Sequence, residues 1–367
     1  MAALRIAVLL VLCMFGKARA EGEVSVGAYL SLTGASATFG VSTQRGIHLA
    51  VEQYNAKAKV KVKVVTLDTM GKQSEATVVV TRLADDGVVA LIGEVGSSST
   101  LAGAAVAQKR GIPMITPSST HPAITDTGDL IFRACQTDDA QAKVMARFAR
   151  TLKIGRIAIL SDQAQAYSTG LATAFETAFK AQGGALVATQ AYTSGAEDFE
   201  TQLRAIEAAK APWVFVPGYY TDVAKLAKQA QQLGIRVKFL GGDGWDGDEL
   251  GKLAGTALDG SYYTNHFAVD DTRAAARAFV KAFTARYKQA PDALAALGYD
   301  AANIVLGAIA KAKSTSGSDL ADAIRATKLV GATGELGFHA KDQGVTKPMV
   351  VLKITGGKPR FAASVTP

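Results

Sequence analysis

The feature that most constrains the fold is a regular alternation, from Val24 onward, of short β-branched or apolar runs with longer amphipathic segments. Such alternation is typical of βαβ units, in which parallel strands form a sheet and the intervening helices cover it. In the first part of the chain the pattern predicts strands at residues 24–30, 60–67, 88–92, 113–116 and 130–133, and helices at residues 40–55, 74–86 and 99–109.

A second series of the same kind begins near Asp138. Its apolar spacing predicts helices at residues 138–152, 168–182, 199–209 and 222–233, and strands at residues 156–161, 185–191, 213–217 and 237–240. This series indicates a second sheet with its own helices.

After residues 260–265 the pattern changes to three helical segments with no strand between them, at residues 272–287, 292–313 and 318–327. We expect these helices to pack on the first sheet. Past a glycine-rich stretch at 331–337, strand-like runs at 347–355 and 358–362 should complete the second sheet. The chain is therefore predicted to form an α/β fold of two Rossmann-like lobes, residues 21–137 plus 266–346 and residues 138–265 plus 347–367.

The first twenty residues have the features of an export signal. Arg5 supplies a positive start, residues 6–15 form an apolar run too short to span a bilayer, and Ala18-Arg19-Ala20 is a small-x-small cleavage site. We expect cleavage before Glu21, which would leave a soluble, exported, periplasmic protein.

The two cysteines indicate neither a lipid anchor nor an internal disulfide. Cys13 follows Leu12, where lipid attachment usually requires a small residue, and lies before the predicted cleavage site. Cys135 is then the one cysteine of the mature chain, so the hydrophobic core must provide the stability.

The charge of the chain does not indicate a nucleic-acid partner. Its 367 residues carry a formal charge of +8, and loss of the signal leaves 37 basic and 32 acidic residues, a charge of +5. The basic residues are scattered rather than gathered in a run or an aromatic-interleaved stripe.

Ligands of open α/β sheets bind beyond the carboxyl ends of the strands, so the loops after the strands are the candidate site. Three loops are unusual: a hydroxyl-rich turn that opens a helix, a turn fixed by two prolines, and a glycine-rich loop that contains an acid. Hydroxyls and backbone N–H groups suit a carboxylate, and an acid suits an ammonium. The loops are residues 93–100 (GEVGSSST), 115–122 (ITPSSTHP) and 241–247 (GGDGWDG).

Other chemistries are less well supported. The third loop matches the dinucleotide-binding pattern G-x-G-x-x-G, but it is late in the chain. Its acids would repel a pyrophosphate, so dinucleotide binding is not expected. The histidines are dispersed rather than at metal-ligand spacing, so no metal and no cofactor are expected. A hydrolase with Ser97 or Ser98 as nucleophile and His121 as base remains an alternative, although no residue nearby singles out one serine as the nucleophile.

Taken together, in this order and behind an export signal, the loops resemble the leucine/isoleucine/valine-binding family of ABC-transporter solute receptors, of the type I periplasmic binding protein fold. That fold implies about three crossover strands between the lobes. The resemblance covers nearly all of the mature chain and includes residues 26–34 with Phe39-Gly40, 96–100, 115–120, 162–167, 218–220 and 298–301.

The resemblance implies a role for each matched residue. Ser97 and Thr120 would donate to a ligand carboxylate, with Ser119 beside them, the Ser118 carbonyl would accept from the ligand ammonium, and Asp243 would neutralise it from the other lobe. The residues expected to wall the pocket are Phe39, Tyr167 and Tyr219, with Trp245 and Leu297 or Tyr299 at the side-chain end.

Two departures from the family are visible. Members often have glutamate where this chain has Asp243, which leaves the identity of the ligand open. Some members have a disulfide where this chain has Gly71 and Gly96, which affects stability alone.

The resemblance implies a non-enzymatic receptor, monomeric, that closes on an aliphatic or other apolar amino acid and presents it to an ABC permease. Within the same fold, an aromatic acid, a short amide or urea is an alternative ligand, although each would leave Asp243 without a cationic partner. A sensory protein that signals to a membrane partner without transport is a further alternative.

Overall fold

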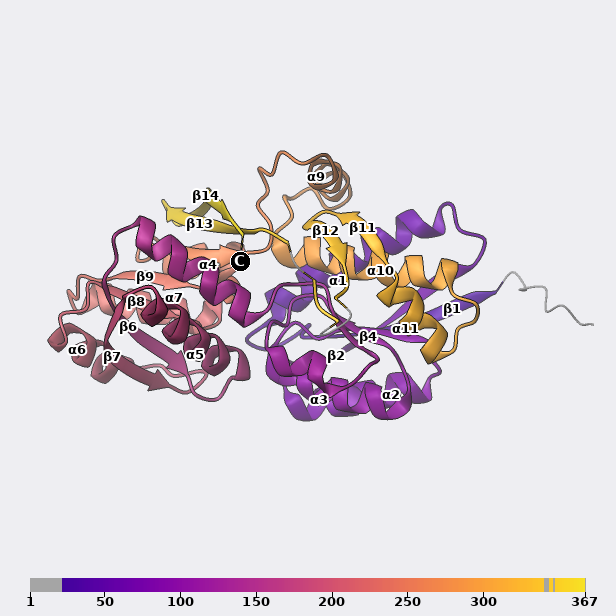
Figure 1. The fold of residues 1–367 in the computed structure, drawn as a ribbon, viewed down its shortest axis with the longest axis horizontal. Helices are drawn as coiled ribbons and strands as arrows, with labels where there is room; N and C mark the ends of the chain where they lie inside the picture. Colours follow the sequence, from indigo (N-terminus) through magenta and orange to yellow (C-terminus); the bar gives the residue numbers. More distant parts are fainter. Residues whose placement is uncertain (1–21, 340–342, 346, 367) are drawn as a thin grey trace, which may run out of the picture.

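A computed structural model describes residues 22–339, 343–345 and 347–366, and places two β-sheets side by side along the long axis of the molecule (Figure 1). The predicted export signal and Cys13 lie outside the described residues. The first sheet is parallel throughout, in the order β2-β1-β3-β4-β5. Its strands are β1 (Glu23–Leu30), β2 (Lys61–Asp68), β3 (Ala90–Gly93), β4 (Met114–Thr116) and β5 (Ile131–Arg133).

The second sheet has the order β14-β13-β10-β9-β8-β6-β7. Strands β6 to β10 are parallel, whereas β13 pairs antiparallel with β10, and β14 antiparallel with β13. The tail thus completes the second sheet, as the sequence predicts. The strands are β6 (Arg156–Asp162), β7 (Ala185–Tyr192), β8 (Trp213–Val216), β9 (Lys238–Gly241), β10 (Tyr262–Asn265), β13 (Met349–Thr355) and β14 (Lys358–Val365).

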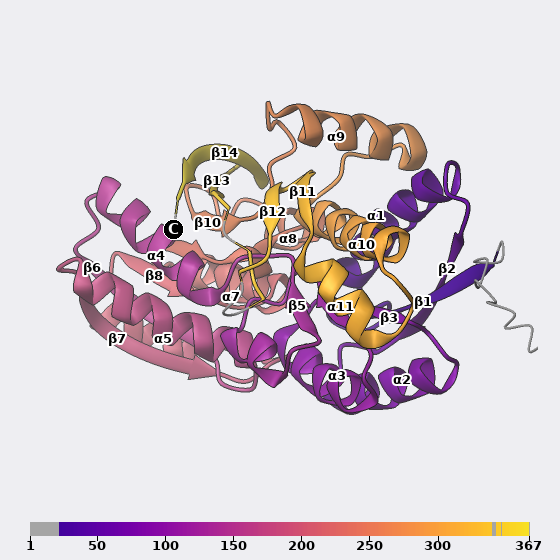
Figure 2. The same ribbon diagram turned by 45° about the vertical axis from the view of Figure 1, so that its right-hand side comes forward.

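Helices cover both faces of the first sheet (Figure 2), with α2 and α3 on one face and α1, α10 and α11 on the other. Strands β3 and β4 are buried throughout because they lie between these two layers. The helices of this half of the molecule are α1 (Ala37–Asn55), α2 (Gln73–Asp85), α3 (Ser97–Arg110), α9 (Ala274–Tyr287), α10 (Ala293–Lys311) and α11 (Gly317–Arg325).

Helices α4 to α7 accompany the second sheet (Figure 1), and α8 packs against α7. The start of α4 is fixed by Thr137, whose hydroxyl accepts from the backbone N–H of Ala140. The helices of this half of the molecule are α4 (Asp138–Thr151), α5 (Ala166–Ala181), α6 (Glu200–Ala208), α7 (Tyr220–Gln232) and α8 (Asp248–Ala254).

Helix α10 packs along α1 in the core of the first half, which confirms the expectation that the late helices return to the first sheet. Glycines make this close approach possible. A Cβ added at Gly46 of α1 would lie 2.0 Å from the carbonyl oxygen of Ala295, and one added at Gly298 of α10 would lie 2.5 Å from that of Thr43. Among the described residues, α10 is the one helix long and apolar enough to cross a membrane, and its burial is that of a core helix.

Three features of the structure were not predicted. Helix α8 is too short for its periodicity to be detected beside a glycine-rich loop, and two 3₁₀ turns, η1 (Pro122–Thr127) and η2 (Asp243–Trp245), follow β4 and β9. The glycine-rich stretch forms an antiparallel hairpin of β11 (Lys328–Gly331) and β12 (Gly334–Gly337). It was not predicted because glycine weakens the alternating pattern of a strand.

Candidate functional site

The first two predicted loops lie side by side because β3 and β4, which precede them, are neighbouring parallel strands. Ser97 is the first residue of α3, and the hydroxyl of Ser118 donates to the carbonyl of Val95 over 3.3 Å. The backbone N–H of His121 approaches Oγ of Ser97 at 3.4 Å. The two loops therefore form one buried surface of hydroxyls and of backbone N–H groups at a helix N-terminus, which can hold an anion.

Within this surface the two neighbouring hydroxyls Ser119 and Thr120 differ. Oγ of Ser119 lies 2.9 Å from the carbonyl oxygen of Glu94 and 2.6 Å from Oγ1 of Thr100, so it joins the two loops to each other. The hydroxyl of Thr120 is buried with no hydrogen-bond partner among the described residues. The hydroxyl of Ser119 is therefore used by the scaffold, whereas that of Thr120 lies beside the Asp138 side chain.

The buried carboxylate of Glu94 holds the same loops from below. Its Oε1 accepts from the hydroxyls of Ser31 at 2.5 Å and Thr69 at 2.9 Å, and its Oε2 accepts from the backbone N–H of Gly96 at 2.7 Å. Burial raises the pKa of Glu94. This network joins the ends of β1, β2 and β3 near Gly71 and Gly96, where some family members are expected to have a disulfide.

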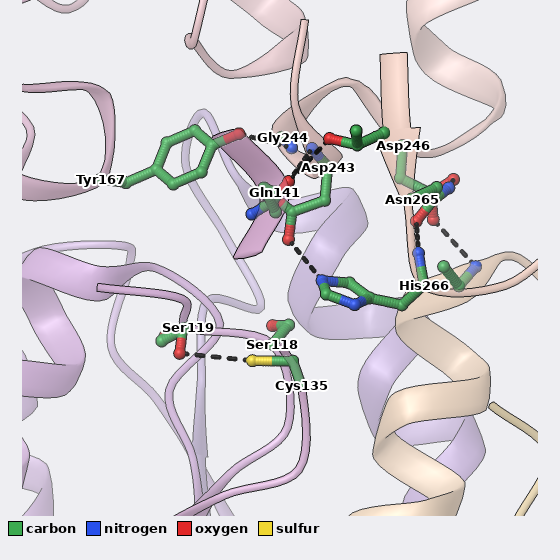
Figure 3. Close-up of polar contacts among 12 residues, drawn as sticks. Ser118, Ser119, Cys135, Gln141, Tyr167, Asp243, Gly244, Asp246, Asn265 and His266 are labelled. Carbon is green, nitrogen blue, oxygen red and sulfur yellow. Dashed lines mark hydrogen bonds and ion pairs between the residues drawn. The ribbon is translucent and has the colours of Figure 1, made fainter. Parts of the chain in front are cut away.

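Asp243 begins the turn after β9 and lies on the other side of the site from Ser118 and Ser119 (Figure 3). Its Oδ1 accepts from Nε2 of Gln141 at 2.9 Å, and its Oδ2 lies 3.0 Å from Nε2 of His266. These contacts fix the carboxylate and leave further lone pairs available to a ligand.

Gln141 and His266 are functional candidates that the sequence analysis missed. Oε1 of Gln141 accepts from the backbone N–H of Asp243 at 3.1 Å and from the hydroxyl of Thr264 at 2.9 Å, so its amide has a single orientation. His266 directly follows β10, at the carboxyl end of a strand, which was the available signal for it. Gln141 lies within a helix and had no such signal.

Asp138, the first residue of α4, is a third missed candidate. Its side chain is buried, and neither carboxylate oxygen has a hydrogen-bond partner among the described residues. Burial raises the pKa of Asp138, and the nearby hydroxyl of Thr120 opposes that shift. In the sequence this residue was hidden because an acid in the first turn of a helix is ordinary.

The predicted aromatic residues Phe39, Tyr167 and Tyr219 meet at the same place from both halves of the molecule. The rings of Tyr167 and Tyr219 stack with centroids 5.1 Å apart, and the ring of Phe39 contacts Tyr219 edge-on at 5.8 Å. Oη of Tyr167 accepts from the backbone N–H of Gly244 at 3.0 Å, and Oη of Tyr219 lies against the backbone N–H of Ser97. Aromatic walls thus adjoin both the hydroxyl loops and Asp243.

Trp245 and Tyr299, which were predicted to line the side-chain end of the pocket, make their contacts elsewhere in the structure. Trp245 is fully buried, packs against Tyr263 and donates its indole N–H to the carbonyl of Val216, so it is a core residue beneath the loop. Tyr299 donates to Oε1 of Gln53 at 2.7 Å. Its ring lies against Phe279 of α9. The sequence pattern of α10 did not show that Tyr299 faces this way.

In the described residues, Ser97 and His121 meet through the backbone of His121 rather than through its ring. Within the described ranges, no group of three or more His, Cys, Asp and Glu side chains could hold a metal ion. His121 reaches Ser97 through its backbone N–H, while its Nδ1 faces the backbone N–H of Ala123 at 3.3 Å. The contact is therefore not that of an imidazole base with a serine nucleophile.

Two Rossmann-like lobes, with polar loops that meet between two sheets, define a periplasmic binding protein. The model of the family "Periplasmic binding protein" matches residues 23–358, and this chain belongs to that family.

Individual relatives agree with this assignment. The chain is 30% identical over 317 residues, 84% of each chain, to the leucine-, isoleucine-, valine-, threonine- and alanine-binding protein of Pseudomonas aeruginosa. It is 34% identical to a leucine-binding protein from Thermotoga maritima, with a TM-score of 0.90 over 94% of this chain and 99% of that one. A branched-chain amino acid transporter substrate-binding protein from Streptococcus pneumoniae, solved with isoleucine, is 30% identical, with a TM-score of 0.88 over 94% of this chain and all of the other.

Proposed function

We propose that this chain is an exported receptor that captures an amino acid with an aliphatic or other apolar side chain and delivers it to an ABC importer. One observation carries the proposal: hydroxyl donors at the ends of β3 and β4 face an acid from the end of β9 (Figure 3), and the stacked rings of Tyr167 and Tyr219 reach both sides. A zwitterion needs this combination of donors, acid and apolar walls. The relatives named above, which bind amino acids, support the same choice of ligand.

The ligand carboxylate would bind the hydroxyls of Ser97 and Thr120, and the ammonium would bind the Ser118 carbonyl and Asp243. Asp138 lies beside Thr120 in this arrangement, and its burial raises its pKa and so favours its neutral form. From charge-assisted bonds in a water-excluded site we expect micromolar affinity, about −8 kcal/mol.

Capture would proceed by closure of two lobes, residues 21–137 plus 266–346 and residues 138–265 plus 347–367. A ligand that contacts both lobes binds the closed form better than the open form and shifts the population toward it. One hydrogen bond joins these two parts of the chain: Oγ of Ser98 accepts from the backbone N–H of Ala166 at 3.0 Å. The permease would then recognise the closed shape.

The test is a thermal-shift screen of the refolded, ligand-stripped protein against the twenty amino acids, benzoate, urea and acetamide. Ligand binding raises the melting temperature by mass action. We expect a rise with apolar amino acids that is lost in Asp243→Ala and Ser97→Ala. The control Asp198→Ala removes an exposed acid of the second lobe and should keep the rise. A response to benzoate or an amide, with none to any amino acid, would overturn the proposal.

Three further measurements address the other parts of the proposal. The amino-terminal sequence of the exported protein should begin at Glu21, and light scattering should give a monomer. Uptake of the labelled ligand in cells with and without the chain should differ. Unchanged uptake with intact binding would instead identify a sensory receptor, and turnover of an ester or amide would identify a hydrolase.

A further inference from the structure

A buried charged group beside the candidate site that the proposed function does not use is the guanidinium of Arg133, the last residue of β5. Arg133 is 1% exposed, and arginine is almost never fully buried without hydrogen-bond partners. Strand β5 pairs with β4, so Arg133 ends beside the loop of residues 115–122 that follows β4. This is one of the two loops that are proposed to bind the ligand carboxylate.

Arg133 binds that loop through its carbonyl groups. Nη1 donates to the carbonyl of His121 at 2.8 Å and to that of Ser119 at 3.3 Å. Nη2 donates to the carbonyl of Pro122 at 3.2 Å and to Oγ1 of Thr125, in the turn η1, at 2.9 Å. The N–H donors of a guanidinium have a fixed planar geometry, so one side chain holds three carbonyls of the same loop in place.

The Ser119 carbonyl decides where the N–H of Thr120 points. The two groups belong to one trans peptide bond, so they point in opposite directions. The thiol of Cys135 also donates to the Ser119 carbonyl, at 3.3 Å (Figure 3), so this oxygen is held by two donors. The N–H of Thr120 is therefore turned away from Arg133 and Cys135.

The carbonyl of Thr120 differs from those of its two neighbours, because it accepts from the backbone N–H of Asp138 at 3.0 Å. The hydroxyl of Thr120 also lies beside the Asp138 side chain, which interacts electrostatically with Asp243. This side of the loop therefore faces the acid on the other side of the candidate site, while Arg133 holds the opposite side.

We propose that Arg133 is a positioning residue for the ligand carboxylate: it holds the carbonyls on both sides of Thr120 and so directs the N–H and hydroxyl of Thr120 into the site. This inference rests on the proposed function. The guanidinium does not touch the ligand, because the loop lies between them. Donors that are already ordered bind more tightly than donors that must be ordered on binding, so Arg133 adds affinity from behind the loop.

The test is calorimetric titration of the mature wild-type receptor and its variants with the amino acid that gives the largest thermal shift. Arg133→Lys keeps the positive charge but replaces the planar fork with a single ammonium. We expect its Kd to rise by about tenfold or more. Thr125→Val is the matched control, since it removes a hydroxyl that binds Nη2 but leaves the carbonyl contacts, and its Kd should equal that of wild type.

Double-mutant cycles separate positioning from a general loss of structure. Combined with Thr120→Val, Arg133→Lys should raise Kd by less than the product of the two single effects, because the hydroxyl that Arg133 positions is already absent. Combined with Tyr220→Phe, which removes a hydrogen bond between α7 and Thr38 of α1, the two effects should multiply. If both cycles multiply, Arg133 acts on the structure as a whole and the proposal is wrong.

A measurement on the wild-type protein decides the case in which urea unfolding shows that Arg133→Lys does not fold. In protein labelled with ¹⁵N-threonine, the amide signal of Thr120 is identified by its absence in Thr120→Ser. This signal should move downfield when the amino acid binds, because the N–H then donates to a carboxylate. An unmoved Thr120 amide would overturn the proposal.

The two levels of inference fail in different ways. If no amino acid binds the wild-type protein, the proposed function itself is wrong, and the role of Arg133 falls with it. If an amino acid binds the wild-type protein, and Arg133→Lys folds and binds it with the same Kd, the proposed function stands but Arg133 is not a positioning residue.

Discussion

Oη of Tyr220 donates to Oγ1 of Thr38 over 3.2 Å, and this bond joins the start of α7 to the start of α1, residues 182 apart in the chain. The ring of Phe39 packs against Tyr220 at 5.1 Å beside it. Helix α7 packs with the second sheet and α1 with the first, so this hydrogen bond joins the two halves of the molecule.

Tyr220→Phe should weaken ligand binding by removing this contact while the ring packing remains. The loss of one neutral hydrogen bond, about 0.5–1.5 kcal/mol, corresponds to roughly a two- to tenfold higher Kd. Titration calorimetry measures it, with faster dissociation in stopped flow as the kinetic counterpart. Tyr299→Phe, which removes a phenol bonded to Gln53 of α1, is the matched control and should leave Kd unchanged. Equal effects of the two variants would contradict a role in closure.

Ser119→Ala and Thr120→Val should have opposite effects, although both residues were predicted at the site. Ser119→Ala removes a hydroxyl that joins two loops and should lower the free energy of unfolding by about 1–2 kcal/mol with little change in Kd.

Thr120→Val removes a buried hydroxyl that neighbours Asp138 without hydrogen-bond geometry, so the free energy of unfolding of the ligand-free protein should change little. Its Kd should rise about tenfold, because the carboxylate loses a donor. Urea unfolding and calorimetry on both variants provide the four values. A larger rise in Kd in Ser119→Ala than in Thr120→Val would reverse the assignment.

Gly46→Ala should be strongly destabilising because the new Cβ would lie 2.0 Å from a backbone oxygen of α10. We expect the free energy of unfolding to fall by about 2–3 kcal/mol. Gly307→Ala in α10, where the Cβ meets nothing within 4 Å, is the control and should raise it by about 0.5–1 kcal/mol through helix propensity. Chemical denaturation of both variants tests the close approach of α1 and α10.

Asp246 should make stability fall as the pH rises. Burial, followed by repulsion from Asp292, raises the pKa of Asp246 to about 8. Because the folded protein holds this proton more tightly than the unfolded chain, the contribution is complete below about pH 4, the ordinary aspartate pKa, and is lost as the pH rises through 8.

Asp246→Asn should remove this part of the pH dependence. Its oxygen can still accept from the backbone N–H of Ala293, but its amide nitrogen faces the donor Nδ2 of Asn265, a cost that does not vary with pH. The difference in unfolding free energy between variant and wild type should grow from pH 5 to pH 8 in favour of the variant. Urea unfolding across that range measures it, and a constant difference would show that Asp246 is ionised in the folded protein.

The order and type of the main elements could be predicted from the sequence because they depend on local patterns. The alternation after Val24 indicated both sheets, and the positions after β3, β4 and β9 indicated the loops of Ser97, Ser118 to Thr120 and Asp243. The exceptions, α8 and the β11–β12 hairpin, are short or rich in glycine, so their patterns are weak.

The partners of these residues were beyond such reasoning. Gln141 is 102 residues from Asp243, and Glu94 reaches Ser31 across 63 residues, so the chain between carries no sign of either contact. Trp245 lies in the core and Tyr299 points to Gln53, although both have sequence positions that suit a pocket.

The sequence by itself determined the two-lobed α/β class and the loops that carry the polar groups, since hydrophobic periodicity and turn residues act over a few positions. Only the tertiary structure decided that Ser119 supports the scaffold while Thr120 lies beside Asp138, and that His266 holds Asp243. The physical reason is that a side chain's hydrogen bonds, burial and protonation depend on neighbours brought together by folding.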